Sequence, residues 1–418
     1  MNENKYAVGV DIGTSAVRVV IGALPAGGSQ PSDESETGLT IVGVGSQPSQ
    51  GMRKGTVVDI NKVAMSLDKA IGAAEMMSGL DVREAVVSVN GSHIAGMSSR
   101  GLITVDQSRP IGPAEIDRVV DAAAQVKMSP NREIISVEPH SFKVDSQEGV
   151  RDPIDMSGVR LEVDAYMITA LTPHIKNLDQ VAEKAVLKPI KPYSPAGLAA
   201  AGIAMSDQQK ENGCVMIDIG HSTTNVVVYE EGDVIDIMVI PVGSNNITTD
   251  LAIGLRADLD VAERVKLEHA VASAHLRRGN EQVVTVRAGG QNQQKFEYET
   301  AVIDEIVEAR LAELFELINK ELRRIKKQAN LPGGAVLTGG GSKLRGIVDY
   351  AKVALQMNAC AYRPRGYKGV TEQINDPAWT TALGLLECSA ESGIHMDGAE
   401  AGRGGLFSKI ASFFGRKN

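Results

Sequence analysis

Two stretches of the chain share one pattern of apolar and polar positions. Each opens with an apolar run, passes through a short turn of aspartate, glycine and hydroxyl residues, and enters a second apolar run; the first begins at Tyr6 and the second at Cys214. Apolar runs of this length on either side of a turn predict two buried strands joined as a hairpin. The repetition predicts an internal duplication, with one sheet-containing domain built around each hairpin.

After the first hairpin the chain shows a different order of predicted strands and helices. Four strand-like runs enclose one helical segment, Pro113–Val126; the runs are Val82–Asn90, Gly101–Asp106, Arg132–Asp145 and Gly158–Thr169. We predict a compact α+β unit of about 80 residues inserted into the first domain. After the second hairpin, helical spacing dominates in Leu259–Ala274 and Ala301–Ala329.

The expected fold class is therefore α/β, with two lobes made of duplicated sheet-and-helix domains and an inserted α+β subdomain. The first domain is expected to comprise residues 1–81, 170–205 and 361–390, with the insert at 82–169. The second is expected at 206–245 and 333–360, with a helix-rich subdomain at 246–332. A Gly-rich polar linker, 391–404, is expected to lead to a terminal helix at 405–418.

Composition narrows the classes of partner and compartment. A net charge of -9 argues against nucleic acid as a partner, because phosphate binding needs a basic face. Three cysteines without a CxxC pair indicate a reducing cytoplasm. The sequence shows no signal peptide at its start and no run of the roughly 20 apolar residues that cross a bilayer, so any membrane contact is expected to be peripheral.

Three glycine turns carry the candidate chemistry. They are Asp11-Ile-Gly-Thr-Ser, Asp218-Ile-Gly-His-Ser-Thr-Thr and Leu337-Thr-Gly-Gly-Gly-Ser-Lys. Glycine lets the backbone close on an oxyanion, hydroxyl groups add donors, and a carboxylate at a strand end can hold hydrated Mg²⁺. Each turn alone is more often a plain connection, but three in this order favour a polyphosphate site. Its candidate residues are Asp11 and Asp218, which would also hold the metal, with Gly13, Thr14, Ser15, Gly220, His221, Ser222, Thr223, Gly339, Gly340, Gly341 and Lys343.

These turns resemble the two phosphate loops and the adenosine loop of the actin, Hsp70 and hexokinase superfamily. The resemblance implies that ATP and Mg²⁺ bind in a cleft between two lobes. It also implies that Glu263 and Lys266 flank the adenine and ribose, and that Gly243 belongs to a turn beside the nucleotide. An ordinary solvated charge pair on a helix explains Glu263 and Lys266 equally well.

The insert resembles that of the bacterial cell-division FtsA family. The segments that carry this resemblance are Val89-Asn-Gly-Ser-His-Ile, Asn131-Arg-Glu-Ile-Ile and Asp152-Pro-Ile-Asp-Met-Ser-Gly-Val-Arg-Leu-Glu. The resemblance implies an actin-like fold whose insert, subdomain 1C, contributes to filament contacts and meets late division proteins. It further implies self-association, binding of the FtsZ C-terminal peptide by subdomain 2B, and a location on the inner face of the membrane at the division site.

The expected ATPase activity is slow or negligible, and no catalytic residue is assigned. Many relatives carry Glu or Gln in the segment that links the lobes, whereas Ser194 is expected to take that place here. A hydroxyl is a poor acceptor for the proton of an attacking water. His221 could contact phosphate from behind the first layer of residues, or it could be a neutral turn residue.

Residues 405–418 predict an amphipathic helix. Leu406, Phe407, Ile410, Phe413 and Phe414 fall on one helical face, and the basic residues Lys409, Arg416 and Lys417 accompany them. This pattern is typical of a helix that lies in the surface of an anionic membrane. The alternative is a terminal helix docked on its own protein.

A basic cluster lies near the end of the helix predicted at Ala301–Ala329. Arg323, Arg324 and Lys327 are either part of a solvated helix face or a site for an acidic peptide such as the FtsZ tail. A sugar or acetate kinase would need a catalytic carboxylate, for which there is no convincing candidate. A PilM-like pilus-assembly protein would share the insert, but it would leave the amphipathic tail unexplained.

Overall fold

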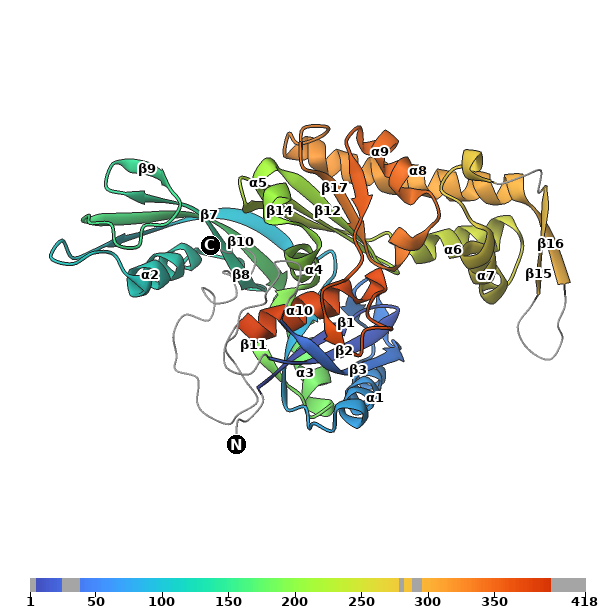
Figure 1. Ribbon diagram of the computed structural model, residues 1–418, viewed down its shortest axis with the longest axis horizontal. Helices are drawn as coiled ribbons and strands as arrows, with labels where there is room; N and C mark the ends of the chain where they lie inside the picture. Colours follow the sequence, from blue (N-terminus) through green and yellow to red (C-terminus); the bar gives the residue numbers. More distant parts are fainter. Residues whose placement is uncertain (1–4, 25–37, 278–281, 288–294, 392–418) are drawn as a thin grey trace.

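The computed structural model describes residues 5–24, 38–277, 282–287 and 295–391. Two lobes lie one above the other, and two arms project sideways from them (Figure 1). The predicted terminal helix, 405–418, lies outside the described residues, as does the predicted linker after residue 391. None of the helices in the described ranges is long and apolar enough to cross a membrane.

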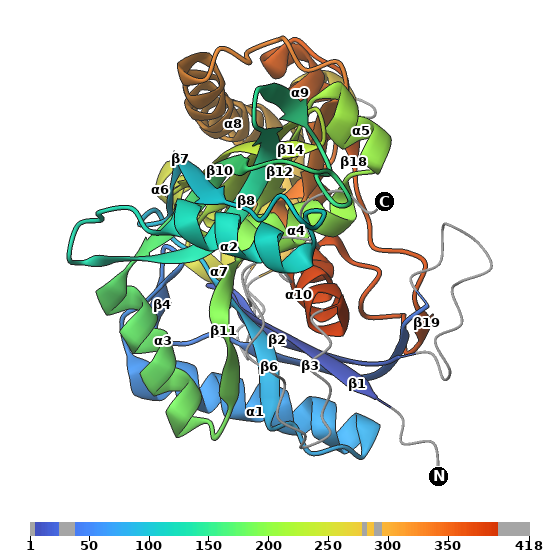
Figure 2. The same ribbon diagram turned by 90° about the vertical axis from the view of Figure 1, so that its left-hand side faces the viewer.

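The lower lobe is built on a six-stranded sheet with helices on both faces. Its strand order is β11 (Lys188–Pro195), β6 (Glu84–Val89), β1 (Tyr6–Ile12), β2 (Ala16–Ala23), β3 (Thr40–Pro48) and β19 (Lys368–Gly369). Gly43 and Gly45 let α1 (Ile60–Ser78) pack closely on one face, and Gly9 does the same for α10 (Thr380–Glu391) on the other. Figure 2 shows the sheet between these two helices. The helices α3 (Thr172–Lys184) and α4 (Ala196–Ala204) and the small hairpin β4 (Met52–Arg53) with β5 (Thr56–Val57) complete the lobe.

The upper lobe repeats the central part of this plan. Its strand order is β14 (Asp233–Ile240), β13 (Thr224–Glu230), β12 (Cys214–Ile219), β17 (Gly334–Thr338) and β18 (Ala359–Ala361). The hairpin β12–β13 corresponds to β1–β2, and β17 runs parallel to β12 as β6 runs parallel to β1. The predicted duplication is therefore confirmed. The helices α5 (Asp207–Asn212) and α9 (Ile347–Leu355) belong to this lobe.

The left-hand arm is the predicted insert. Its sheet has the order β7 (Ala95–Thr104), β10 (Arg160–Leu171), β8 (Arg132–Val144) and β9 (Gln147–Val150), and α2 (Pro113–Ala124) packs on it at Gly101. The strand predicted at Gly101–Asp106 begins earlier, at Ala95. The residues before Gly101 are mostly small or polar and have no apolar alternation; six consecutive pairs with β10 hold them in the sheet.

The right-hand arm is helical. It contains α6 (Ser244–Gly254), α7 (Leu259–His269), α8 (Thr300–Arg324) and the hairpin β15 (Val283–Arg287) with β16 (Lys295–Glu299). The predicted helices ending at Ala274 and Ala329 are both too long. The chain turns extended at Ala270, where Val271 pairs with Arg345, and Lys326 and Ala329 have left-handed backbones that end α8.

One carboxyl group is buried where the insert meets both lobes. Glu138 of β8 is 3% exposed, receives a hydrogen bond from the Ser136 hydroxyl, and lies near enough to Tyr229 of β13 and Cys388 of α10 to influence their pKa values. Burial raises the pKa of Glu138 from 4.5 to about 8. This side chain is therefore neutral in the folded protein at neutral pH.

Glu138→Gln is expected to stabilise the protein more at pH 8 than at pH 5. Below pH 4.5 both the folded and unfolded states hold the proton; between 4.5 and 8 only the unfolded state releases it, so the raised pKa destabilises the fold as pH rises. The shift corresponds to at most about 5 kcal/mol at pH 8. Urea unfolding at both pH values measures it, with the exposed Glu297→Gln as control. An equal effect of Glu138→Gln at the two pH values would contradict the assignment.

Candidate nucleotide site

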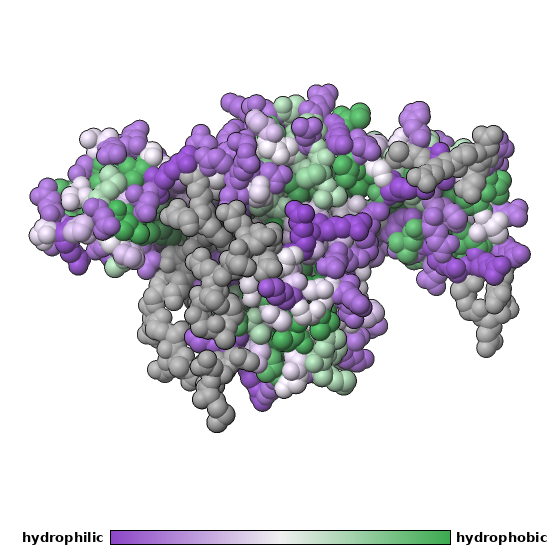
Figure 3. Space-filling model, viewed as in Figure 1, coloured by the Kyte–Doolittle hydropathy of each residue, from purple (hydrophilic) through white to green (hydrophobic). Residues whose placement is uncertain are grey.

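A cavity of about 530 Å³ lies between the two lobes. Where the lobes meet, the surface carries a hydrophilic band (Figure 3). Fourteen of the sixteen residues predicted for the nucleotide line this cavity: Asp11, Gly13, Thr14, Ser15, Asp218, Gly220, His221, Thr223, Glu263, Lys266, Gly339, Gly340, Gly341 and Lys343. The three glycine turns, far apart in sequence, thus meet around one space.

Two buried carboxylates occupy equivalent places at the ends of β1 and β12. The Ser88 hydroxyl donates to Asp11 at 2.9 Å, and the Asn225 amide donates to Asp218 at 3.0 Å. Burial raises the pKa of both groups, to about 6 for Asp218, where the negative charge of Asp11 adds to the effect. Two carboxylates that oppose each other's ionisation would gain stability from a cation placed beside them.

The turns after these carboxylates leave no room for a side chain. A Cβ on Gly13 would lie 2.9 Å from the Ala16 carbonyl oxygen, and one on Gly220 would lie 2.8 Å from the Thr223 carbonyl oxygen. Gly339 has a φ of +80°, and a side chain there would overlap the Asp218 carboxylate. Glycine at these positions keeps backbone, rather than side chains, at the wall of the cavity.

Arg18 is a lining cation that the sequence analysis missed. It lies on β2, and its guanidinium is 5.7 Å from the centroid of the Trp379 ring. Lys343 pairs with Asp376 at 2.6 Å, and Lys266 pairs with Glu263 at 2.7 Å. Arg18 lies opposite Asp11 on the neighbouring strand, and its positive charge works against the rise in the pKa of Asp11 and Asp218 while it lines the cavity.

Gly243 and Ser222, the other two predicted residues, do not line this cavity. A Cβ on Gly243 would press on the Gly220 and His221 carbonyl oxygens, which accept hydrogen bonds from the Ser244 and Asn245 N–H groups at 2.9 and 2.7 Å. Gly243 thus lets the start of α6 dock behind the second loop. The Ser222 hydroxyl is buried and makes no hydrogen bond to a described residue.

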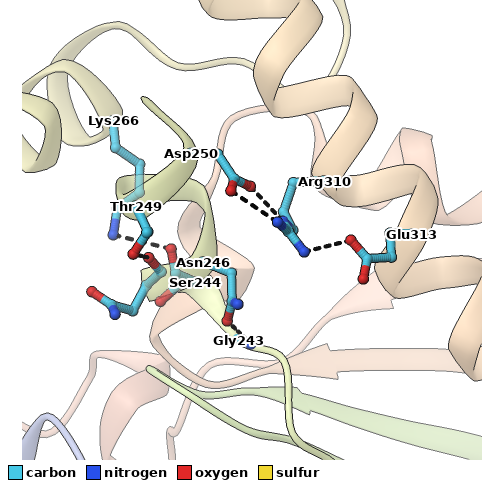
Figure 4. Close-up of polar contacts among 9 residues, drawn as sticks. Gly243, Ser244, Asn246, Thr249, Asp250, Lys266, Arg310 and Glu313 are labelled. Atoms are coloured by element: carbon cyan, nitrogen blue, oxygen red, sulfur yellow. Dashed lines mark hydrogen bonds and ion pairs between the residues drawn. The ribbon is translucent and has the colours of Figure 1, made fainter. Parts of the chain in front are cut away.

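The helix α6 is fixed from two sides (Figure 4). Lys266 of α7 donates to the Ser244 carbonyl at 3.4 Å and to the Thr248 hydroxyl at 2.9 Å. Arg310 of α8 donates to both carboxylate oxygens of Asp250. The first turn of α6 is hydrogen-bonded to the second glycine turn through the Ser244 and Asn245 N–H groups. The contacts that fix α6 therefore also set the position of that turn.

The expectation for Ser194 is wrong. Its side chain is 1% exposed and lies outside the cavity lining, because Ser194 still pairs with Ser88 in the sheet. Ala196, the first residue of α4, reaches the cavity instead. The methyl group of Ala196 cannot accept a proton, and slow hydrolysis stays a prediction.

The basic cluster on α8 pairs with acids of the same chain. Arg323 pairs with Glu316, Arg324 with Asp236 and Glu321, and Lys327 with Glu230. An acidic peptide would have to displace these partners.

Further lining residues had no sequence signal of their own. They come from strand ends, helix starts and α7, and comprise Asn90, Ala196, Asn225, Ser244, Ile247, Leu267, Glu268, Ala270, Leu344, Arg345, Pro377, Ala378 and Thr381. Leu267, Leu344 and Pro377 give the cavity an apolar part, which suits a planar base.

Solved structures with this fold include nucleotide-bound proteins. The PilM-PilN type IV pilus biogenesis complex matches with a TM-score of 0.61 and 18% identity over 91% of this chain and 97% of that one. MreB 5 of Spiroplasma citri bound to AMPPNP matches with a TM-score of 0.53 and 14% identity, covering 91% and 95%. At these identities the likeness establishes the actin-like fold alone.

Sequence comparison is more specific. The model of the SHS2 domain inserted in FTSA matches residues 91–169, and that of Cell division protein FtsA matches residues 215–384. The FtsA proteins of Pseudomonas aeruginosa and Bacillus subtilis are 33% and 37% identical over 92% and 93% of this chain, which covers 89% and 84% of theirs. That of Escherichia coli K12 is 28% identical over the whole chain and 97% of its own length. The protein therefore belongs to the FtsA family of bacterial cell division proteins.

Proposed function

We propose that this cell division protein binds ATP between its lobes, polymerises, and tethers FtsZ filaments to the inner face of the cytoplasmic membrane. The observation that carries the ATP site is the pair of buried carboxylates, Asp11 and Asp218, at the ends of duplicated hairpins. Around them lie the three glycine turns and Arg18, which together suit a polyphosphate. The solved MreB 5 relative with bound AMPPNP supports the same assignment.

The donor set fits Mg²⁺. This ion commonly takes one or two protein carboxylates and completes its shell with water and phosphate oxygens. Asp11 and Asp218 would supply the carboxylates, and the described residues contain no cluster of three or more candidate ligands that would form a site without the nucleotide. Bound Mg²⁺ would neutralise charge on the phosphates, while Arg18 and the glycine turns hold the phosphates in place.

Hydrolysis in this cleft should be slow. An attacking water needs an acceptor, and Ala196 faces the cavity where such a group could stand. The Asn225 amide nitrogen donates to Asp218, and its oxygen, which has no partner among the described residues, belongs to a neutral amide and is a poor general base. ATP is then mainly a ligand that closes the cleft and stabilises the closed form by mass action.

Ala196→Gln is expected to speed phosphate release, because its amide oxygen can orient a water in the cavity. We expect a rise of at least about fivefold in single-turnover phosphate release, a small part of what general base catalysis can reach. Ser194→Ala is the matched control in the same segment and should change nothing. An Ala196→Gln variant that binds ATP but releases phosphate at the wild-type rate would contradict this explanation of slow turnover.

The tail and the polymer act together in the proposed function. A short amphipathic helix with Lys409, Arg416 and Lys417 would bind anionic lipid weakly and reversibly as a single copy. In a polymer, each further tail binds at a high effective concentration, so assembly strengthens attachment without new lipid contacts. The FtsZ C-terminal peptide would bind the helical arm, with Arg323, Arg324 and Lys327 as candidate contacts, and late division proteins would bind the insert.

The pilus-assembly alternative now rests on fold alone. The similarity to the PilM-PilN complex is 18% identity, whereas family membership follows from the FtsA relatives. The amphipathic tail remains the feature that distinguishes the two functions.

Co-sedimentation with anionic vesicles tests the tether. The full chain should pellet with phosphatidylglycerol-containing vesicles, and more of it with Mg-ATP, whereas a chain ending at Arg403 should stay in solution. The double variant Phe413→Glu and Phe414→Glu keeps the length of the chain and should behave like the truncation. Equal pelleting of all three proteins would contradict a membrane role for the tail.

A further inference from the structure

The insert is joined covalently to the lower lobe and packs against both lobes. The chain enters it after β6 and leaves it into α3, both in the lower lobe. In Figure 1 the insert extends sideways beside β14, the edge strand of the upper lobe. The insert is therefore a second bridge between the lobes, in addition to the segments of chain that connect them.

A tyrosine of the insert is hydrogen-bonded to β14. The Tyr166 hydroxyl donates to the Asp236 carboxylate at 2.6 Å and accepts the Ile237 N–H at 3.2 Å. Arg324 of α8 pairs with the other oxygen of Asp236. A side chain at Gly96 of β7 would overlap the Tyr166 phenol, so glycine there leaves the passage through which the tyrosine reaches the upper lobe.

Two more contacts join the insert to the upper lobe. The His140 ring lies parallel to the Tyr166 ring, with centroids 6.2 Å apart, and contacts the backbone of Val234 on β14. Arg151 pairs at 3.1 Å with Glu211 of α5, which is held to the upper lobe by the hydrogen bond from the Glu231 N–H to the Glu211 carbonyl. We call Tyr166, His140 and Arg151, with their partners, the clasp.

The attachment to the lower lobe is of another kind. The His93 ring accepts the Leu171 N–H and donates to the Asn90 carbonyl, and so ties the incoming chain to the outgoing chain. Arg132 donates to the His93 and Thr169 carbonyls. We call these residues, where the chain enters and leaves the insert, the joint; the hydrogen bonds just described lie within it. Towards the lower lobe the described residues show a stack of the His93 ring on His174 of α3, with centroids 4.2 Å apart, and non-directional apolar packing of β8 and β10 on β11 and α3.

Within the described ranges, the side-chain hydrogen bonds and ion pairs that leave residues 95–169 for a lobe go to the upper lobe. Stacked rings can slide in their own plane, whereas a hydroxyl bonded to a carboxylate is directional and charge-assisted. When the two lobes move, the joint should therefore give way before the clasp does.

We infer that the insert moves with the upper lobe when the cleft closes, and bends at the joint around His93. The first residue of this joint already touches the cleft: the Asn90 amide donates to the Thr223 hydroxyl of the second phosphate loop at 3.4 Å. The surface that the insert offers to its partners thus reports whether the cleft is open or closed. The clasp is a property of the protein alone, and only its response to closure rests on the proposed nucleotide binding.

Distances between spin labels on three exposed positions test this inference. The labels are placed in the Cys360→Ser chain on Lys69→Cys in α1, Asp121→Cys in α2 and Val353→Cys in α9, two at a time. Mg-AMPPNP should change the 69–353 distance, which reports closure, together with the 69–121 distance. The 121–353 distance should stay constant. Calorimetry on the same labelled proteins measures nucleotide binding separately.

Tyr166→Phe, which removes the hydroxyl and keeps the ring, is expected to broaden the 121–353 distribution even without nucleotide. Tyr350→Phe on α9 is the matched control and should leave it unchanged. If the 121–353 distance changes on closure while 69–121 stays constant, or if nucleotide binds and no pair changes, the inference is overturned and the proposed function stands. If calorimetry shows no binding, the proposed function fails, and an unchanged distribution in Tyr166→Phe then overturns the clasp on its own.

Discussion

Two buried carboxyl groups that line one cavity are the constraint around which this molecule is organised. Asp11 and Asp218 end the same strand of two duplicated hairpins, and both are almost inaccessible to solvent. Burial raises the pKa of both groups, and the charge of Asp11 adds to the rise at Asp218, while Arg18 opposes it; ionised carboxylates in this cleft therefore cost free energy. A cation bound with phosphates, as proposed above, would offset that cost. Stability and ligand binding therefore depend on the same two side chains.

The other features of the cleft surround this pair with backbone while leaving it accessible to a ligand. Gly13, Gly220 and Gly339 bring main chain where a Cβ would collide, and Gly243 lets α6 support the second loop from behind. Lys266 and Arg310 then fix α6 against α7 and α8. A movement of the second loop is thereby coupled to the whole helical arm, just as Asn90 and the clasp couple it to the insert.

The hairpins, the duplication and half of the cavity lining could be predicted because their signals are local. An apolar run and a glycine turn need only neighbouring residues, and three such turns in order imply one site. Arg18 was missed since a single arginine in a strand reads as an exposed residue, and only the packing against Trp379 shows that it faces the cleft. Ser194 was chosen over Ala196 because the sequence does not fix where β11 ends.

Pairings across the chain lay beyond the sequence in the same way. Arg324 and Asp236 are 88 residues apart, and nothing near either one indicates that they meet. The first half of β7, before Gly101, was not predicted as a strand and is held in the sheet by its pairing with β10. What the sequence alone specified was therefore the chemistry of each turn, whereas the tertiary structure determined which cations are available and which are already paired.

The role of the two carboxylates is tested by calorimetric titration with ATP, in Mg²⁺ and in EDTA, of wild type and of the double variant Asp11→Asn and Asp218→Asn. We expect wild type to bind at least about tenfold more tightly with Mg²⁺, a difference of roughly 1.4 kcal/mol. The double variant should lose this dependence, and its nucleotide-free form should be more resistant to unfolding because no buried carboxylate has to ionise. A double variant that keeps the full Mg²⁺ dependence would show that Asp11 and Asp218 do not hold the cation.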